Sequence, residues 1–85
     1  MTHEEIWNGI VNLAKRLNLT CSGLARMAGL DPTVFNKSKR INRNGVPRWP
    51  STYSLARVLN VAKIDLAEFA NLMKQDKNSQ KEKNK

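Results

Sequence analysis

Polar and cationic side chains suited to contacting nucleic-acid bases recur between Gly29 and Arg40. An asparagine amide can pair with adenine through two hydrogen bonds, whereas lysine and arginine can pair with guanine or with a phosphate. A threonine can contact a base or a phosphate, and Val34 fits equally well as a contact to a thymine methyl group or as a half-buried neighbour of Phe35. The candidate base-contacting residues are Thr33, Val34, Asn36, Lys37 and Arg40.

A capped helix is expected to present these side chains. Asp31 is a good N-cap, because its carboxylate can accept from the free amides of a first turn, and Pro32 suits a first helical position that needs no amide donor. We therefore expect a helix from Pro32 to about Lys39. Phe35 should point inward and anchor this helix, which leaves the opposite face to solvent.

A shorter helix is predicted just upstream. Thr20 can cap its start, and Gly29 can end it in a backbone conformation that glycine tolerates best. Its inward-facing residues would be Leu24, Ala25 and Ala28. Two helices joined by a three-residue turn with a glycine form the helix-turn-helix pattern.

Three further helices complete an all-α layout of five. A capping box at residues 2–5 predicts a first helix to about Leu17, and Pro50-Ser51 open a helix near the middle of the chain. A second capping box at residues 65–68 starts the last helix. Its inward-facing residues would be Leu66, Phe69 and Leu72.

The segment from Ile41 to Trp49 is the irregular part of the chain. Asn44-Gly45 is a tight-turn signal, yet Pro47 and Pro50 argue against regular strand pairing. We expect an extended loop, whose tip can be hairpin-like.

Positive charge is concentrated after the predicted base-reading helix. The chain has 15 Lys and Arg against 7 Asp and Glu, a net charge of +8, and residues 1–73 alone keep +5. Residues 74–85 form a basic tail without apolar side chains, which we expect to be mobile. A run of cations is often only a solvated surface, but beside a helix-turn-helix pattern it indicates a polyanionic partner. The run consists of Lys37, Lys39, Arg40, Arg43 and Arg48.

The chain resembles the lambda repressor-like, or xenobiotic-response-element, family of helix-turn-helix domains over residues 6–73. The resemblance is carried by Leu24-Ala25, Gly29, the polar capped segment after it, and residues 55–59 and 65–69. Residues 31–40 followed by 47–51 are similar to the amino-terminal domains of phage-type repressors. Those repressors also carry a self-cleaving peptidase domain, which supplies much of their dimerisation and their damage-triggered switch. That domain has no counterpart in this sequence.

The resemblance implies a sequence-specific regulator of transcription, most simply a repressor. It would bind double-stranded DNA at a two-fold operator as a weak or DNA-assembled homodimer, with the helix from Pro32 in the major groove. It also implies that the start of the Thr20 helix faces the DNA backbone. Arg43 and Arg48 would contact a phosphate or a minor-groove edge, or else be merely solvated. The candidate backbone contacts are Thr20, Cys21, Ser22, Lys39, Arg43 and Arg48.

Catalytic and metal chemistry have little support in the sequence. His3 is the only histidine and Cys21 the only cysteine, which excludes a Cys/His zinc set and an intramolecular disulfide. We therefore expect no enzyme activity, no metal, no cofactor and no small-molecule substrate. Without an apolar run long enough to cross a bilayer or a signal-peptide pattern, we expect a cytoplasmic protein without a membrane contact.

Two rival functions remain. One is an antitoxin-like interaction module whose DNA binding is secondary, and the other is a nonspecific coat driven by charge. The first should present an exposed apolar patch, for which the candidates are Trp7, Val11 and Met73. Trp7 suits the edge of the core better than a dimer contact. Trp49 suits packing over the end of the base-reading helix better than a DNA contact.

Overall fold

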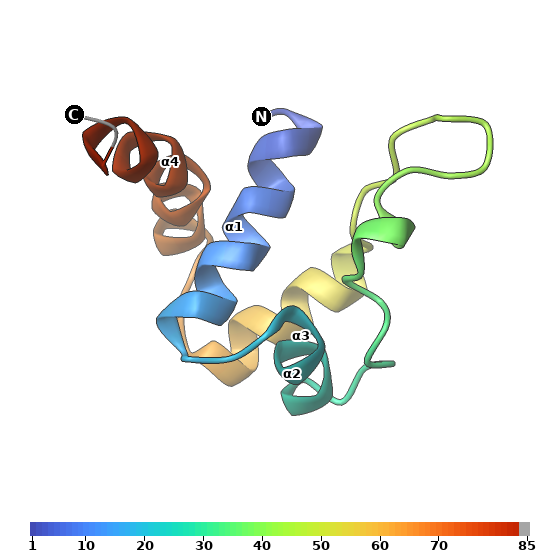
Figure 1. Cartoon of the computed structure of the whole chain (residues 1–85). Helices are drawn as coiled ribbons and strands as arrows, with labels where there is room; N and C mark the ends of the chain where they lie inside the picture. Colours follow the sequence, from blue (N-terminus) through green and yellow to red (C-terminus); the bar gives the residue numbers. More distant parts are fainter. Residues whose placement is uncertain (84–85) are drawn as a thin grey trace.

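A computed structural model of the chain describes the backbone of residues 1–83 and the side chains of residues 1–75. Within residues 1–83 the chain forms four α-helices and one short 3₁₀ helix, and its only β-type pairing is an isolated bridge. The elements are α1 (His3–Arg16), α2 (Cys21–Met27), η1 (Lys37–Lys39), α3 (Thr52–Ala62) and α4 (Leu66–Lys83) (Figure 1). The all-α prediction is confirmed, but the prediction of five α-helices is wrong.

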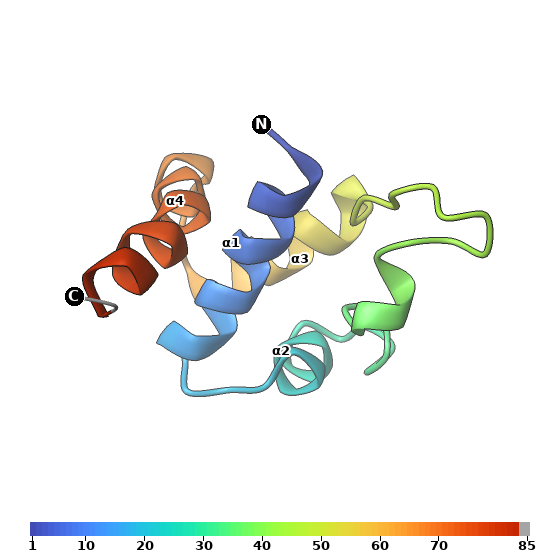
Figure 2. The same cartoon turned by 45° about the horizontal axis from the view of Figure 1, so that its top comes forward.

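Helix α1 is the central element of the arrangement. It packs against α4 on one side and α2 on the other, and α2 packs against α3. Figures 1 and 2 both place the loop that precedes α3 on the side of the molecule away from α4. The loop with the basic run therefore projects freely, while α4 covers the opposite side of α1.

Local hydrogen bonds set both ends of α1. The Thr2 hydroxyl accepts from the Glu5 amide at 3.1 Å and the Glu5 carboxylate accepts from the Thr2 amide at 2.9 Å, which is the predicted capping box. After Arg16, Asn18 adopts a left-handed conformation (φ 64°). This turn lets the Leu19 amide donate to a carbonyl in the last turn of the helix at 2.8 Å. The helix thus ends one residue before the predicted position.

Helix α2 begins and ends at its predicted signals. The Thr20 hydroxyl accepts from the Gly23 amide at 3.0 Å. At the other end Gly29 has φ +76°, and the Leu30 amide donates to the Ala25 carbonyl at 2.9 Å, closing the turn that follows a left-handed residue. The turn orients the chain for the segment that begins at Asp31.

Helices α3 and α4 also start at side-chain caps. The Ser51 hydroxyl accepts from the Ser54 amide at 3.0 Å, and the Asp65 carboxylate accepts from the Glu68 amide at 2.9 Å. Leu66 was expected to face inward, but it is 64% exposed. It is the first residue of α4, in an exposed first turn, and the burial of the helix against α1 begins at Phe69.

The core lies between the four helices and the segment that follows α2. Its largest fully buried side chains are Ile10, Leu13, Leu24, Phe35, Val58 and Phe69. The buried Asn12 amide donates to the Leu72 carbonyl at 2.7 Å, which ties α1 to α4. A buried amide with a partner avoids the penalty of an unsatisfied polar group and fixes the relative position of the two helices.

The predicted tail of residues 74–85 begins inside α4, whose backbone continues to Lys83. The side chains after Gln75 and the last two residues lie outside the described part of the chain, so the expected mobility of the tail stays a prediction. Over the described residues, none of the helices combines the length and apolar character that a membrane crossing requires.

Candidate nucleic-acid interface

The predicted helix from Pro32 to Lys39 does not form. Asp31 forms the expected kind of local hydrogen bond but caps no helix: its carboxylate accepts from the Thr33 amide at 2.8 Å and from the Thr33 hydroxyl at 2.6 Å. The chain then makes a turn over residues 32–35, extends at Asn36 (φ −64°, ψ 151°), and forms only the short η1. Its backbone hydrogen bonds span three residues, from the Val34 amide to the Asp31 carbonyl at 3.1 Å and from the Asn36 amide to the Thr33 carbonyl at 3.0 Å.

The composition of this segment explains why the Asp31 hydrogen bond does not start a helix. Thr33, Val34, Asn36 and Ser38 are weak helix formers, and a short helix requires either strong propensity or packing along its whole length. Packing here is concentrated on Phe35, which is fully buried with its ring centroid 6.2 Å from that of Trp7. The inward orientation of Phe35 is confirmed, and it anchors a turn in place of a helix.

Arg40 packs against the protein. Its guanidinium carbon lies 4.9 Å from the centroid of the Trp7 ring, a cation–π contact, and its Nη2 donates to the Phe35 carbonyl at 3.1 Å. The same nitrogen lies 4.0 Å from the Cys21 sulfur, and Nε is buried without a partner in the described structure. A base contact by Arg40 would therefore require these contacts to break.

Residues 40–48 form a hairpin, so the pairing that the turn signal allowed at the tip extends to the base of the loop. The Arg48 amide donates to the Arg40 carbonyl at 2.8 Å, and the Asn42 amide donates to the Val46 carbonyl at 2.9 Å. One antiparallel bridge lies between these bonds. At the tip the Asn42 carboxamide oxygen accepts from the Asn44 and Val46 amides, which closes the turn through a side chain. The arms are too short for a regular two-stranded sheet.

The first turns of α1 hold the base of this hairpin. His3 Nε2 lies 2.8 Å from the Arg40 carbonyl, and Trp7 Nε1 lies 3.0 Å from the Arg48 carbonyl. His3 Nε2 is also 3.1 Å from Trp7 Nε1. We assign the hydrogen bonds so that His3 donates to the Arg40 carbonyl and Trp7 donates to the Arg48 carbonyl, because this arrangement gives each carbonyl a donor. Trp49 is 50% exposed and packs edge-on against His3 with a centroid distance of 6.0 Å. Trp7 is 4% exposed and belongs to the core.

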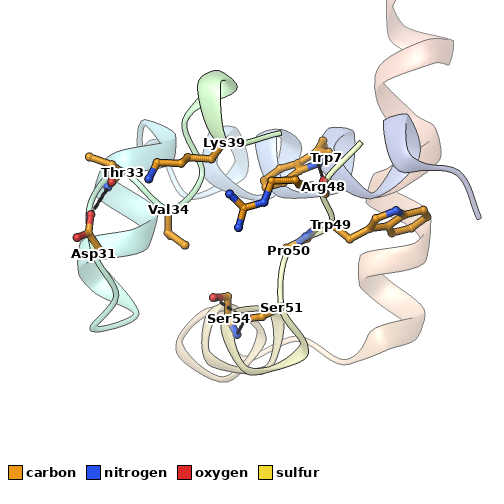
Figure 3. Close-up of a pocket in the computed structure, with 10 residues that line it drawn as sticks. All are labelled: Trp7, Asp31, Thr33, Val34, Lys39, Arg48, Trp49, Pro50, Ser51 and Ser54. Atoms are coloured by element: carbon orange, nitrogen blue, oxygen red, sulfur yellow. Dashed lines mark hydrogen bonds between the residues drawn. The ribbon is translucent and has the colours of Figure 1, made fainter. Parts of the chain in front are cut away.

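The predicted contact residues divide between two adjacent hollows. One is a pocket of about 300 Å³ that contains four of them, Thr33, Val34, Lys39 and Arg48 (Figure 3). The other, of about 460 Å³, is lined by Lys37 and Arg40 together with residues from the first turns of α1. Asn36 and Arg43 are exposed outside both hollows. The structure thus brings most of the predicted residues to one side of the molecule without aligning them on one helix.

The predicted backbone contacts of α2 lie beside the base of the hairpin. Thr20 is exposed, with its hydroxyl engaged in the cap and 3.4 Å from that of Ser22. Cys21 is half-buried next to Arg40. Neither Ser22 nor Cys21 lines the two hollows.

The pocket also contains residues that the sequence did not single out. Figure 3 shows the first turn of α3 below the Arg48 and Lys39 side chains, with Ser51 and Ser54 facing them. Asp31 lies at the rim, and hydrogen bonds from Thr33, aided by the Lys39 charge, lower the pKa of its carboxyl. Ser51 was identified only as the start of a helix, and no local pattern marked Ser54 or the role of His3, because these depend on contacts between distant segments.

Comparisons of the chain with models of protein families, with curated proteins and with solved structures gave no match.

Proposed function

We propose that the protein binds double-stranded DNA through the side formed by residues 31–49 and acts as a sequence-specific regulator of transcription, most simply a repressor. The observation that carries the proposal is a set of exposed cations on a segment that the core holds in place. These cations are Lys37, Lys39, Arg43 and Arg48. The sole carboxylate of the segment, Asp31, is engaged by Thr33.

Binding would use a turn and a hairpin in place of a continuous recognition helix. The major groove admits a two-stranded ribbon as well as a helix, and the hairpin carries Arg43 next to its tip. Asn36 is exposed and is the best candidate for a base edge. Lys37 can contact a guanine at a specific site, but on a random-sequence duplex Lys37, like Lys39, Arg43 and Arg48, suits a phosphate. A homodimer on a two-fold operator remains part of this proposal.

The antitoxin-like alternative finds no support at the residues named for it. Trp7 is buried, and Val11 and Met73 are half-buried, so they do not form an exposed apolar patch.

The proposal is tested with two double variants, each of which removes two positive charges from one side of the molecule. Lys37→Gln/Arg43→Gln removes cations from the proposed interface, and Arg16→Gln/Lys74→Gln removes the same charge from α1 and α4 on the other side. Binding to a random-sequence duplex is measured at several salt concentrations by fluorescence anisotropy. We expect the first variant to reduce the slope of log K against log salt by about 1.8 and the second to leave it close to the original value. Equal effects of the two variants would contradict the assigned surface.

A further inference from the structure

The pocket in Figure 3 brings two cations from different segments toward one space. Lys39 reaches it from the end of η1 and Arg48 from the second arm of the hairpin, and the first turn of α3 forms the wall opposite them. Neither cation has a hydrogen bond or an ion pair within the described structure. An anion that binds between the two side chains would be stabilised by both charges.

The hydroxyl groups of the pocket differ in what they can donate. Thr33 donates its hydroxyl hydrogen to Asp31 at 2.6 Å, and Ser51 donates to the Ser54 hydroxyl oxygen at 3.0 Å. The Ser51 oxygen in turn accepts from the Ser54 amide. Ser54 therefore receives a hydrogen bond while its own hydroxyl hydrogen has no acceptor in the described structure. Because Ser54 is 5% exposed and lines the pocket, that hydrogen is a donor for a ligand.

Asp31 lowers the positive charge of the pocket without cancelling it, because its one carboxylate stands against the two cations Lys39 and Arg48. Its carboxylate lies at the rim and already accepts two hydrogen bonds from Thr33. The free donors of the pocket are the Lys39 ammonium, the Arg48 guanidinium and the Ser54 hydroxyl. Such a set suits a tetrahedral oxyanion, because each donor can engage a different oxygen.

We propose that this pocket holds a single phosphodiester group of the DNA backbone, shared by Lys39 and Arg48 and contacted by the Ser54 hydroxyl. The inference rests on the proposed DNA binding and adds to it one defined contact. The volume of about 300 Å³ leaves room for water and part of the attached sugar beside the apolar walls of Val34 and Pro50. Seating one phosphate between η1, the hairpin and α3 fixes the register of all three on the duplex.

The salt dependence of binding distinguishes a shared phosphate from two separate ones. Each phosphate neutralised contributes about 0.9 to the slope of log K against log salt. If Lys39 and Arg48 share one phosphate, Lys39→Gln/Arg48→Gln reduces the slope by about 0.9. Lys37→Gln/Arg43→Gln, whose cations are not both in one hollow, reduces it by about 1.8. An equal reduction of about 1.8 by both double variants would overturn the shared site.

Ser54→Ala provides a second readout that leaves the charge unchanged. Its backbone amide still donates to Ser51, so the cap of α3 is retained. We expect affinity for the random-sequence duplex to fall about ten- to a hundredfold with an unchanged salt slope, since one hydrogen bond to a charged group is lost. Thr52→Ala, an exposed change in the same turn outside the pocket, should leave the affinity unchanged. Equal losses in the two variants would contradict the assigned donor.

The experiment separates failure of this inference from failure of the proposed function. If the original chain binds no duplex, the proposed function fails and the phosphodiester assignment fails with it. If it binds and the two double variants behave alike, only the pocket fails. Inorganic phosphate, titrated at constant ionic strength and followed by tryptophan fluorescence, tests the other source of the same ligand. Saturation of the pocket by inorganic phosphate while the duplex stays bound would assign it to a free anion and overturn the proposal.

Discussion

Trp7 Nε1 lies 3.0 Å from the main-chain oxygen of Arg48, which joins the buried face of α1 to the second arm of the hairpin. Trp7 is 41 residues distant from Arg48 in the sequence, and its ring also packs against Phe35 and beneath Arg40. One core side chain therefore contacts the turn, the base of the hairpin and its second arm. The position of the exposed cations depends on this contact.

Replacing Trp7 by phenylalanine should loosen the hairpin while the core keeps an aromatic ring. The lost hydrogen bond leaves the Arg48 carbonyl without its indole donor, and the smaller ring weakens packing, so we expect a loss of about 1–3 kcal/mol in the free energy of unfolding. Urea unfolding followed by circular dichroism measures it. Tyr53→Phe, at a side chain 66% exposed, should stay within about 0.5 kcal/mol. Equal stability of the two variants would contradict the role of Trp7.

Replacing Arg40 by alanine should lower the free energy of unfolding by more than it weakens the free energy of DNA binding by the folded protein. The cation–π contact with Trp7 and the hydrogen bond to the Phe35 carbonyl together predict a loss of about 2 kcal/mol in unfolding free energy. Thermal unfolding and duplex binding are measured on the same preparations. Arg43→Ala, which removes an exposed side chain, should weaken DNA binding more than it lowers the free energy of unfolding. If Arg40→Ala instead lost affinity at full stability, Arg40 would contact the DNA directly.

Two glycines with similar backbone angles provide a matched test of the turn after α2. Gly29 and Gly45 have φ +76° and +79°, so alanine at either position introduces a left-handed strain of about 1 kcal/mol. At Gly29 the new methyl group would also lie 2.8 Å from Arg57 Nη2, whereas nothing lies within 4 Å at Gly45. Arg57 donates to the Ala28 carbonyl at 2.9 Å, and its displacement adds to the loss. Unfolding measurements should therefore find Gly29→Ala less stable than Gly45→Ala, and equal losses would show that Arg57 moves without penalty.

The Asp31 carboxyl should titrate below its ordinary pKa of 3.8, and Thr33→Val should move its pKa back upward. The hydrogen bond from the Thr33 hydroxyl is the largest cause of the lowered pKa, and Lys39→Gln should raise it less. Because the pKa of Asp31 is lower in the folded state than in the unfolded state, the ionised carboxylate stabilises the fold at pH values above the unfolded pKa. This contribution is lost as the pH falls through the folded pKa. NMR titration of the Asp31 side chain measures these shifts, and an unchanged pKa in Thr33→Val would contradict the assigned hydrogen bond.

The helix starts were predictable from the sequence because a cap is a local contact. Thr2, Thr20, Ser51 and Asp65 each accept from an amide three residues ahead, so their types and spacing carry the information. Asp31 carries the same local signal but accepts from Thr33, two residues ahead. A cap indicates where a helix can start, but it does not supply the packing that a helix needs to continue.

The geometry of the candidate interface could not be predicted in the same way. The burial of Phe35 follows from its apolar side chain, but the contacts of Arg40 with Trp7 and of His3 with Arg40 join residues more than thirty positions apart. Exposed and packed arginines look alike in a sequence, since the long side chain can do either. Composition therefore located the basic segment, and only the fold distinguishes Arg40 from Arg43 and Arg48.

Selection from a pool of randomised duplex DNA at near-physiological salt tests the central claim most directly. The purified chain is incubated with the pool, and the retained duplexes are sequenced. The account predicts an enriched sequence, preferred over random duplex by about a thousandfold or more, and loss of about 1–3 kcal/mol at one base position when Asn36 is replaced by alanine. Inverted half-sites in that sequence would establish a dimer on the DNA. Retention of duplex without any enriched sequence would contradict a sequence-specific regulator and leave a protein that binds DNA through its charge alone.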